Sequence, residues 1–287
     1  MGHWRRLLCA PIKLIAEHLI KFLVCVASFP HQTLAEDIGH GTYFLAGLSP
    51  DYAVVAIDSR ELEVGVPNDR YCKIRPLSRN AFFFSRGVTS ATDNNTHDKI
   101  FDARDIAHSV YVQFGIGSTR FDEMAQAWAE RVLSIYRTKP SEFANYAVQN
   151  IMVGGFFVGL DESGTIKYSS QRIVLQPYGF PQFINSAEPK PVGSTNPEEG
   201  PTYASGYFEI VREFMSGNRT ERAKAVIDNL GTLPSGPDRV AAIYAAIVNS
   251  VAKWSGEIGI GGDIAAIILE RGQDWRWYHR PDFCPQY

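Results

Sequence analysis

The sequence predicts an α+β fold in which antiparallel strands pack against helices. Two runs of β-forming residues, Thr42–Leu48 and Ala53–Ile57, flank the turn sequence Ser-Pro-Asp-Tyr and should form a hairpin. The run Ala81–Ser85 is so apolar that both of its faces must be buried, as in a central strand of a sheet covered by helices. Further along, Phe121–Arg137 carries apolar residues on one stripe and charged residues opposite, which indicates an amphipathic helix.

The remaining elements follow from the same periodicities and from turn residues. Further strands are expected at Tyr71–Arg75, along a second hairpin Asn150–Leu175, at Ile264–Leu269 and at an edge position, Asp274–Tyr278. Further helices are expected at Phe101–Phe114, 206–216, 220–229 and Pro237–Trp254. Loops are expected at Glu61–Arg70, at Thr89–His97 and at a proline-rich insertion, 177–203, which holds too many prolines for a helix or a central strand.

Composition excludes some classes of function. The chain has 287 residues, 45% of them apolar and 21% charged, which is typical of a globular protein. Its net charge of −3 and its lack of a basic cluster with interleaved aromatics argue against a nucleic-acid partner. The four cysteines lack the spacing of metal ligands, so we expect no metal site. We expect Cys72 to be a small buried thiol, with a single bridge to Cys284 as the alternative.

Residues 1–41 are interpreted as a leader or propeptide, and 42–287 as one domain. Basic residues precede the apolar run Phe22–Phe29, and small residues follow it near Ala35, which is the order of a secretory signal. The run is too short to cross a bilayer, which needs roughly 20 residues, so we expect no stable membrane span. The protein should be exported or periplasmic if this signal is real, and cytoplasmic otherwise. An amphipathic propeptide helix and a misassigned start codon are the alternatives.

Thr42, at the head of the first strand, is the candidate nucleophile. A threonine hydroxyl reacts poorly unless a base removes its proton, and cleavage between Gly41 and Thr42 would supply that base as the new α-amino group of Thr42. Such an amine titrates near roughly 8, close enough to neutrality to accept the proton. The pattern therefore indicates an N-terminal-nucleophile hydrolase.

Four motifs carry a resemblance to a known family. Gly41-Thr42 with its apolar strand, Val54–Arg60 (VVAIDSR), Lys73-Ile74 and Gly87-Val88-Thr89 resemble the proteasome β-subunit superfamily, in its bacterial type. The 16-residue separation of Thr42 from Asp58 matches the family without a gap, and Lys73 and Gly87 both fit after one shared deletion. The resemblance covers nearly all of residues 41–279. It implies the four-layer αββα sandwich of that family, with two antiparallel sheets flanked by helices (the Ntn-hydrolase fold).

The resemblance also implies an activity. A threonine peptidase would mature by cutting its own Gly41–Thr42 bond and would then hydrolyse bonds in a peptide or protein substrate. The Thr42 hydroxyl would attack, the backbone N–H of Gly87 would face the oxyanion, and Lys73, held by Asp58, would lower the proton affinity of the amine. No metal or organic cofactor is implied. Assembly into a ring-like homo-oligomer is implied by the family alone.

Two supporting residues are expected from the same match. Ser205, in a small-residue turn that leads into a helix, would hydrogen-bond near the Thr42 amine, with a plain helix cap as the alternative. Arg60 would steady the Asp58 carboxylate, with an exposed, unengaged arginine as the alternative.

The chain departs from the family near its C-terminal Gly-Gly. Where active members carry an aspartate and a serine just ahead of Gly-Gly, this chain has Glu257 and Ile260. Ile260 has no hydroxyl, which favours a catalytically inactive scaffold subunit as one alternative. An amidohydrolase that uses the same nucleophile on a small amide or acyl-homoserine-type substrate is another.

Overall fold

The computed structural model describes residues 42–63, 66–92, 99–138, 143, 151–176, 182–187, 197, 201–205, 233–254, 256 and 259–286. The predicted leader, the predicted helices at 206–216 and 220–229, and Glu257 lie outside these residues. Within the described part, two five-stranded antiparallel sheets and the helices packed on them confirm the predicted α+β class.

The first sheet is built around the predicted N-terminal hairpin. Its strand order is β12-β1-β2-β13-β14, with bounds Tyr203–Ser205, Phe44–Leu48, Tyr52–Asp58, Ile264–Glu270 and Arg276–His279. Strands β1 and β2 pair antiparallel, with Phe44 opposite Ile57, and β13 pairs with the other edge of β2, with Ile264 opposite Asp58. The hairpin and the strand predicted at Ile264–Leu269 are therefore confirmed.

The second sheet contains the very apolar strand and the second predicted hairpin. Its order is β11-β10-β9-β6-β5, with bounds Gln182–Ala187, Ile166–Gln176, Ile151–Leu160, Ala81–Gly87 and Ile74–Ser78. Strand β6 lies between β5 and β9, and Phe82, Phe83 and Phe84 are all fully buried. Successive strand residues point to opposite faces, so both faces of β6 are covered, as predicted.

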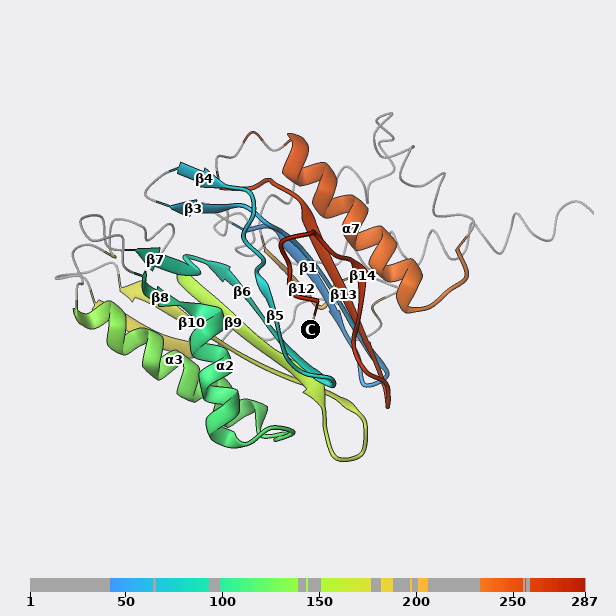
Figure 1. The fold of residues 1–287 in the computed structure, drawn as a ribbon, viewed down its shortest axis with the longest axis horizontal. Coiled ribbons are helices and arrows are strands. Elements are labelled where there is room, and N and C mark those ends of the chain that lie inside the picture. The colour runs from blue at the N-terminus through green and yellow to red at the C-terminus, as the bar shows by residue number, and fades with distance from the viewer. Residues whose placement is uncertain are drawn as a thin grey trace, which may run out of the picture.

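The two sheets face each other, and the helices cover their outer faces (Figure 1). Apolar side chains of both sheets form the inner layer, where the rings of Phe44, Phe84 and Phe156 lie 4.5–5.5 Å apart, centroid to centroid. Helices α2 (Ala103–Phe114) and α3 (Phe121–Thr138) pack on the second sheet, and α7 (Pro237–Trp254) packs on the first. The layers run helices, sheet, sheet, helix.

Several helix, strand and loop boundaries differ from those predicted. The proline-rich insertion contains a strand, β11, that pairs with the edge of β10 between flanking prolines. The predicted loop after Asp58 contains the short pair β3 (Glu61–Glu63) and β4 (Val66–Asn68). The predicted helix at Phe101 begins two residues later, because β8 (Lys99–Asp102) pairs with β7 (Ser90–Thr92) and the Asp102 carboxylate caps the helix.

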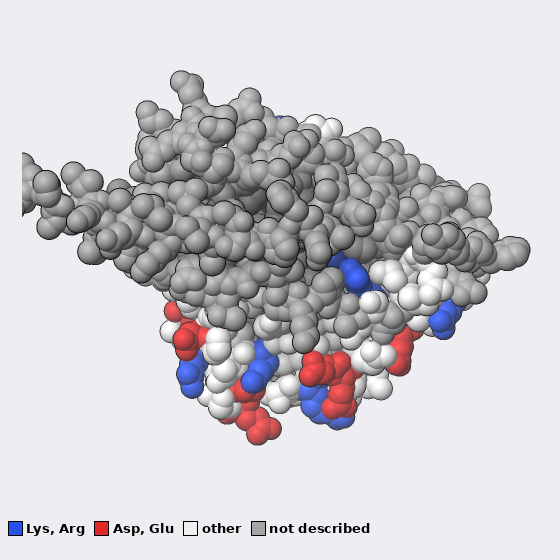
Figure 2. All heavy atoms as spheres, turned by 180° about the vertical axis from the view of Figure 1, so that it is seen from behind, with Lys and Arg blue, Asp and Glu red and all other residues white. Residues whose placement is uncertain are grey.

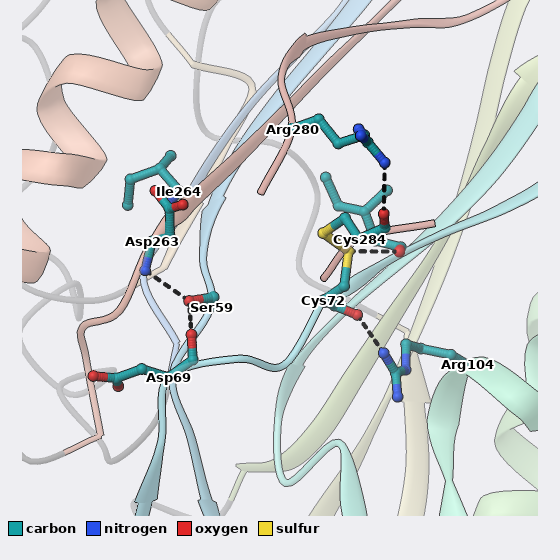
Figure 3. Close-up of a disulfide and its surroundings, with 9 residues drawn as sticks. Ser59, Asp69, Cys72, Arg104, Asp263, Ile264, Arg280 and Cys284 are labelled. Carbon is teal, nitrogen blue, oxygen red and sulfur yellow. Dashed lines mark hydrogen bonds between the residues drawn. A yellow bond between two sulfur atoms is a disulfide. The ribbon is translucent and has the colours of Figure 1, made fainter. Parts of the chain in front are cut away.

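The expectation of a free thiol at Cys72 is wrong. Cys72 and Cys284 form a disulfide with their Cα atoms 5.2 Å apart, across a sequence separation of 212 residues (Figure 3). Both cysteines are buried in the layer between the sheets. Burial alone does not distinguish a thiol from a bridged cysteine, so only the fold, which brings the C-terminal segment beside Cys72, decides the pairing.

The surface is mixed in charge where the structure describes it. In Figure 2, positive and negative side chains lie next to one another on the described part of that face. Among the described helices, none combines the length and the apolar character that crossing a membrane would need.

Candidate active site

Thr42 lies directly before β1 and is 4% exposed. The backbone N–H of Gly87, at the end of β6 in the other sheet, donates a hydrogen bond to Thr42 Oγ1 (3.3 Å). Gly87 has φ of +80°, and a Cβ atom here would overlap the carbonyl oxygen of Met152. A glycine is therefore required at this point, where the ends of two strands from different sheets meet.

Asp58 ends β2 and is fully buried. Its Oδ1 accepts hydrogen bonds from Lys73 Nζ (2.8 Å) and from the Tyr43 N–H (3.1 Å), and its Oδ2 accepts one from the Gly261 N–H (3.0 Å). The Asp58 N–H in turn donates to the Tyr43 carbonyl (3.1 Å). The carboxylate is thus fixed from three sides and lies against the residue that follows Thr42.

Lys73 precedes β5 and is 1% exposed. Its carbonyl accepts a hydrogen bond from the Ser85 N–H (3.2 Å), which fixes its backbone to β6, while its ammonium group pairs with Asp58. Burial lowers the pKa of Lys73, and the neighbouring Asp58 charge opposes that shift. Burial also raises the pKa of Asp58, against the opposing effects of Lys73 and the two backbone donors.

Such a pair contributes little net stability. Removing two charges from water costs several kcal/mol per ion in order of magnitude, and their mutual attraction returns about as much. A buried pair that is also held by backbone donors instead gives its two groups one fixed geometry. Functional sites often retain buried charged groups despite the free energy that burying them costs, so the Asp58–Lys73 pair is consistent with a role in catalysis.

Arg60 forms its ion pair with Asp69. Its guanidinium forms a two-bond pair with Asp69, with Nε–Oδ1 at 2.5 Å and Nη2–Oδ2 at 2.9 Å, and Nη1 donates to the Ile260 carbonyl (3.2 Å). Arg60 therefore fixes the turn that presents the Gly261 N–H to Asp58, and its charge also interacts electrostatically with Asp58.

Ser59 fastens the same turn from the other side. Its hydroxyl donates to the Asp69 carbonyl (2.6 Å) and accepts from the Asp263 N–H (2.8 Å), as Figure 3 shows. Ile260, beside them, is 4% exposed and packs among the apolar residues under α7. At this point of the described structure the chain presents backbone groups to the site, and the Ile260 side chain is turned into the core.

Ser205 is the last residue of β12. This strand pairs antiparallel with β1, and Ser205 lies opposite Phe44 in that register. The backbone of Ser205 therefore lies on the strand beside β1, opposite the residue two positions after Thr42. The helix expected to follow Ser205 lies outside the described residues.

A second buried polar cluster, not found from the sequence, adjoins Gly87. Glu61 is 4% exposed, its Oε1 accepts a hydrogen bond from the Thr89 hydroxyl (2.7 Å), and burial raises its pKa. The Thr89 carbonyl accepts from the Ala103 N–H (2.8 Å), so this cluster joins the strand that leaves Gly87 to the start of α2. The N-cap position of Asp102 was the available signal, since an aspartate before an apolar-periodic run commonly caps a helix.

Asp102 and Arg104 complete this cluster. Burial acts to raise the pKa of Asp102, but the hydrogen bonds and charge of the Arg104 guanidinium outweigh it and lower the pKa to about 2. Arg104 also donates to the Cys72 carbonyl (2.7 Å) and lies over the Tyr71 ring, 3.8 Å from its centroid. The cluster thereby reaches the segment that carries Lys73.

The described residues place a candidate nucleophile beside candidate supporting groups. The Gly87 N–H contacts the Thr42 hydroxyl, and the Asp58–Lys73 pair binds the N–H of the next residue, Tyr43. The described part of the chain has no group of three His, Cys, Asp or Glu side chains that could hold a metal ion. A scan against models of protein families finds no match for the chain, and a search of curated proteins finds none either.

Proposed function

We propose that this protein is a threonine-type peptidase of the N-terminal-nucleophile class, with the αββα fold of a proteasome β subunit, activated by cleavage between Gly41 and Thr42. The hydrogen bond from the Gly87 N–H to Thr42 Oγ1 supports the proposal most directly, because it joins the candidate nucleophile to the candidate oxyanion donor. The Asp58–Lys73 pair, anchored on the Tyr43 N–H, adds a buried cation near the same residue.

The chemistry follows from these groups. After cleavage, Thr42 Oγ attacks the carbonyl carbon of the scissile bond, and its proton passes to the Thr42 amine, directly or through one water molecule. The Gly87 N–H donates to the oxygen that becomes negatively charged. The protonated amine then gives its proton to the departing nitrogen, which leaves an ester on Thr42. A water molecule hydrolyses that ester and releases the acid product.

Lys73 has an electrostatic role in this scheme. Its ammonium group disfavours a second positive charge nearby, so it lowers the pKa of the Thr42 amine and keeps more of the amine neutral at pH 7. Asp58 holds Lys73 in place through the 2.8 Å contact. In this scheme the Thr42 amine is the base, and the Asp58–Lys73 pair sets the pKa of that amine.

Maturation requires the same groups before the amine exists. Thr42 Oγ would attack the Gly41 carbonyl, the peptide nitrogen would leave as the new α-amine, and water would hydrolyse the resulting ester. Gly41 lies outside the described residues, so this step rests on the position of Thr42 and Gly87 alone.

The intact mass and N-terminal sequence of the purified protein test this proposal. We expect a chain that begins at Thr42 and cleaves fluorogenic peptides, and we expect Thr42→Ala to remain unprocessed and inactive. Thr138→Ala, at an exposed threonine near the end of α3, is the matched control and should be processed normally. A mature protein that begins at Met1 or Asp37 would contradict the proposal.

The buried position of Ile260 favours one alternative, a catalytically inactive scaffold subunit. A folded chain that stays unprocessed and cleaves no peptide, amide or ester would support that alternative. Turnover of small amides without turnover of peptides would instead indicate an amidohydrolase. We also propose a ring-like homo-oligomer, which light scattering of the mature protein tests directly.

Export is proposed as well. Disulfides persist in oxidising compartments and are rare in the cytosol, so the Cys72–Cys284 bridge supports export independently of the leader. Fractionation of cells that express the full chain, with detection of a mature form in the exported fraction, tests this proposal.

A further inference from the structure

The segment that carries Lys73 is joined to both sheets by backbone hydrogen bonds. Tyr71, Cys72 and Lys73 lie between the end of β4 and the start of β5, outside either ladder. The Tyr71 N–H donates to the carbonyl of Ser59, directly after β2 of the first sheet (3.2 Å), and the Lys73 carbonyl accepts from the Ser85 N–H (3.2 Å) in the second sheet. The segment therefore bridges the two sheets. The Tyr71 hydroxyl also donates to Asp102 (3.1 Å) and Lys73 pairs with Asp58, so Cys72 lies between two held residues.

That middle residue, Cys72, is held on two sides. Arg104 Nη1 donates to its carbonyl from the side of α2, and its sulfur is bonded to Cys284 (Figure 3). Cys284 sits in a turn closed by its own N–H, which donates to the Pro281 carbonyl (3.0 Å), and Arg280 donates to its carbonyl (3.1 Å). The disulfide thus connects Lys73, through one peptide bond, to a small folded C-terminal turn.

The ion pair between this turn and Arg70, two residues before Cys72, is exposed. Arg70 pairs with Asp282 (3.1 Å) with about two thirds of each side chain exposed, or more, and lies over the Phe283 ring, 5.3 Å from its centroid. Exposed pairs of this kind contribute roughly 0–1 kcal/mol. This ion pair therefore attaches the C-terminal turn far more weakly than the covalent bond does.

Both cysteines close the layer between the sheets. Cys72 is 3% and Cys284 2% exposed, and they lie in the same apolar cluster as Ile74. Without the bond, release of the C-terminal turn would open this edge of the layer and admit water within one residue of Lys73. A buried ammonium group that gains access to water is no longer confined to one partner.

We propose that the Cys72–Cys284 disulfide is a positioning element for Lys73, and that its reduction by a dithiol, which reaches the buried bond when the C-terminal turn opens locally, switches the site to a low-activity state while the sheets stay folded. The activity part of this inference rests on the proposed function. In the reaction, a dithiol gives two electrons and two protons to the bridge, the S–S bond breaks to two thiols, and the dithiol becomes a disulfide. The disulfide therefore makes the activity of the site depend on an oxidising environment.

The mature chain is suited to the test, because Cys9 and Cys25 belong to the leader and residues 42–287 contain only these two cysteines. The first measurement does not depend on catalysis. Lysine labelling by reductive methylation, read by mass spectrometry, should find Lys73 protected in the oxidised protein and labelled in protein reduced with dithiothreitol. Circular dichroism should stay unchanged between the two. Lys73 equally protected in both states would overturn the positioning role.

The second measurement addresses activity. Reduction should lower kcat for a fluorogenic peptide by between about 10- and 100-fold, as expected for a misplaced tuning group, with KM changed less. The acid limb of the pH profile should move to higher pH, because the Thr42 amine loses a neighbouring cation. Four charged groups act electrostatically on Lys73 and complete the environment that the profile reports: Asp58, Glu61, Arg60 and Asp69. Reoxidation should restore both parameters.

Variants separate the outcomes. Cys284→Ser should reproduce the reduced state without reductant, whereas Asp282→Asn, which weakens only the exposed ion pair, should behave as the oxidised protein. Unchanged kcat and pH profile on reduction, or activity lost only together with the circular dichroism signal, would overturn the switch. An oxidised protein that labels as expected but hydrolyses no substrate would leave the positioning role standing and contradict the proposed function.

Discussion

Lys73 Nζ lies 2.8 Å from Asp58 Oδ1, and neither side chain is accessible to solvent. The pair links the two sheets, because Asp58 ends a central strand of the first and Lys73 precedes the edge strand of the second. The same carboxylate accepts the N–H groups of Tyr43 and Gly261, so one side chain fixes three segments that are far apart in the sequence. Removing the charge of either Asp58 or Lys73 should therefore change the free energy of unfolding measurably.

Lys73→Met should destabilise the protein strongly. The variant leaves the Asp58 carboxylate buried with only its backbone donors, and breaking a buried pair in this way costs about 3–5 kcal/mol. Urea unfolding at pH 7 measures the loss, and lowering the pH should recover part of it, since a protonated Asp58 needs no counter-ion. Lys167→Met, at an exposed lysine on β10, should change the free energy of unfolding by no more than about 0.5 kcal/mol. Equal losses in the two variants would contradict the assigned pairing.

Gly87→Ala should damage the site through geometry. Its positive φ and the overlap of a Cβ atom with the Met152 carbonyl oxygen both oppose a side chain, so the N–H that contacts Thr42 must move. We expect kcat to fall by about 100-fold or more if this N–H serves the oxyanion. Gly115→Ala isolates the conformational cost, because Gly115 has φ of +95° with open space around a Cβ atom. Stability should fall in both variants and kcat in Gly87→Ala alone.

The elements that were predicted correctly are those whose residue pattern lies within one continuous segment. The β1–β2 hairpin, strand β6 and helices α3 and α7 each follow from periodicity within one segment, and each was found within a few residues of its expected bounds. The strand β11 was missed because prolines at 177, 181 and 189 frame a short run that pairs at a sheet edge, where flanking prolines are tolerated. Local patterns predict such an edge strand poorly.

The site could be predicted only in part, because half of it is made of backbone groups. Thr42, Asp58, Lys73 and Gly87 are recognisable by type and spacing; the structure joins Gly87 to Thr42, joins Lys73 to Asp58, and bonds Asp58 to the N–H of Tyr43, the residue after Thr42. The Tyr43 and Gly261 N–H donors have no side-chain signature. The Arg60–Asp69 and Cys72–Cys284 pairings depend on contacts that only the three-dimensional fold creates.

Lowering the pH should remove the contribution of the Asp102 carboxylate to the free energy of unfolding. Its pKa of about 2 in the folded state lies below the ordinary value of 3.8, so the group adds stability above pH 4 that is lost as the pH falls from about 4 to 2. The difference corresponds to about 2 kcal/mol. Asp102→Asn keeps a good N-cap but loses the charge, so wild type should exceed the variant by that amount at pH 6 and converge with it near pH 2. Asp105→Asn, on the exposed side of α2, is the control and should differ little from wild type throughout. A gap between wild type and Asp102→Asn that does not depend on pH would contradict the assignment.

Ile260→Ser tests whether the missing hydroxyl limits the activity. The side chain of Ile260 packs with apolar residues beneath α7, while its carbonyl binds Arg60, so a serine here would lose apolar contacts and bury a hydroxyl among hydrocarbon neighbours. We expect the free energy of unfolding to fall by about 2–4 kcal/mol, as for other large-to-small core changes, and peptide turnover not to rise. Ile260→Val is the matched control, with a loss of about 1 kcal/mol and unchanged turnover. Denaturant unfolding and peptide kinetics on the same samples provide both readings. Higher turnover in Ile260→Ser than in wild type would mean that the hydroxyl reaches the Thr42 region, and the inactive-scaffold alternative would then gain a simple explanation in this one substitution.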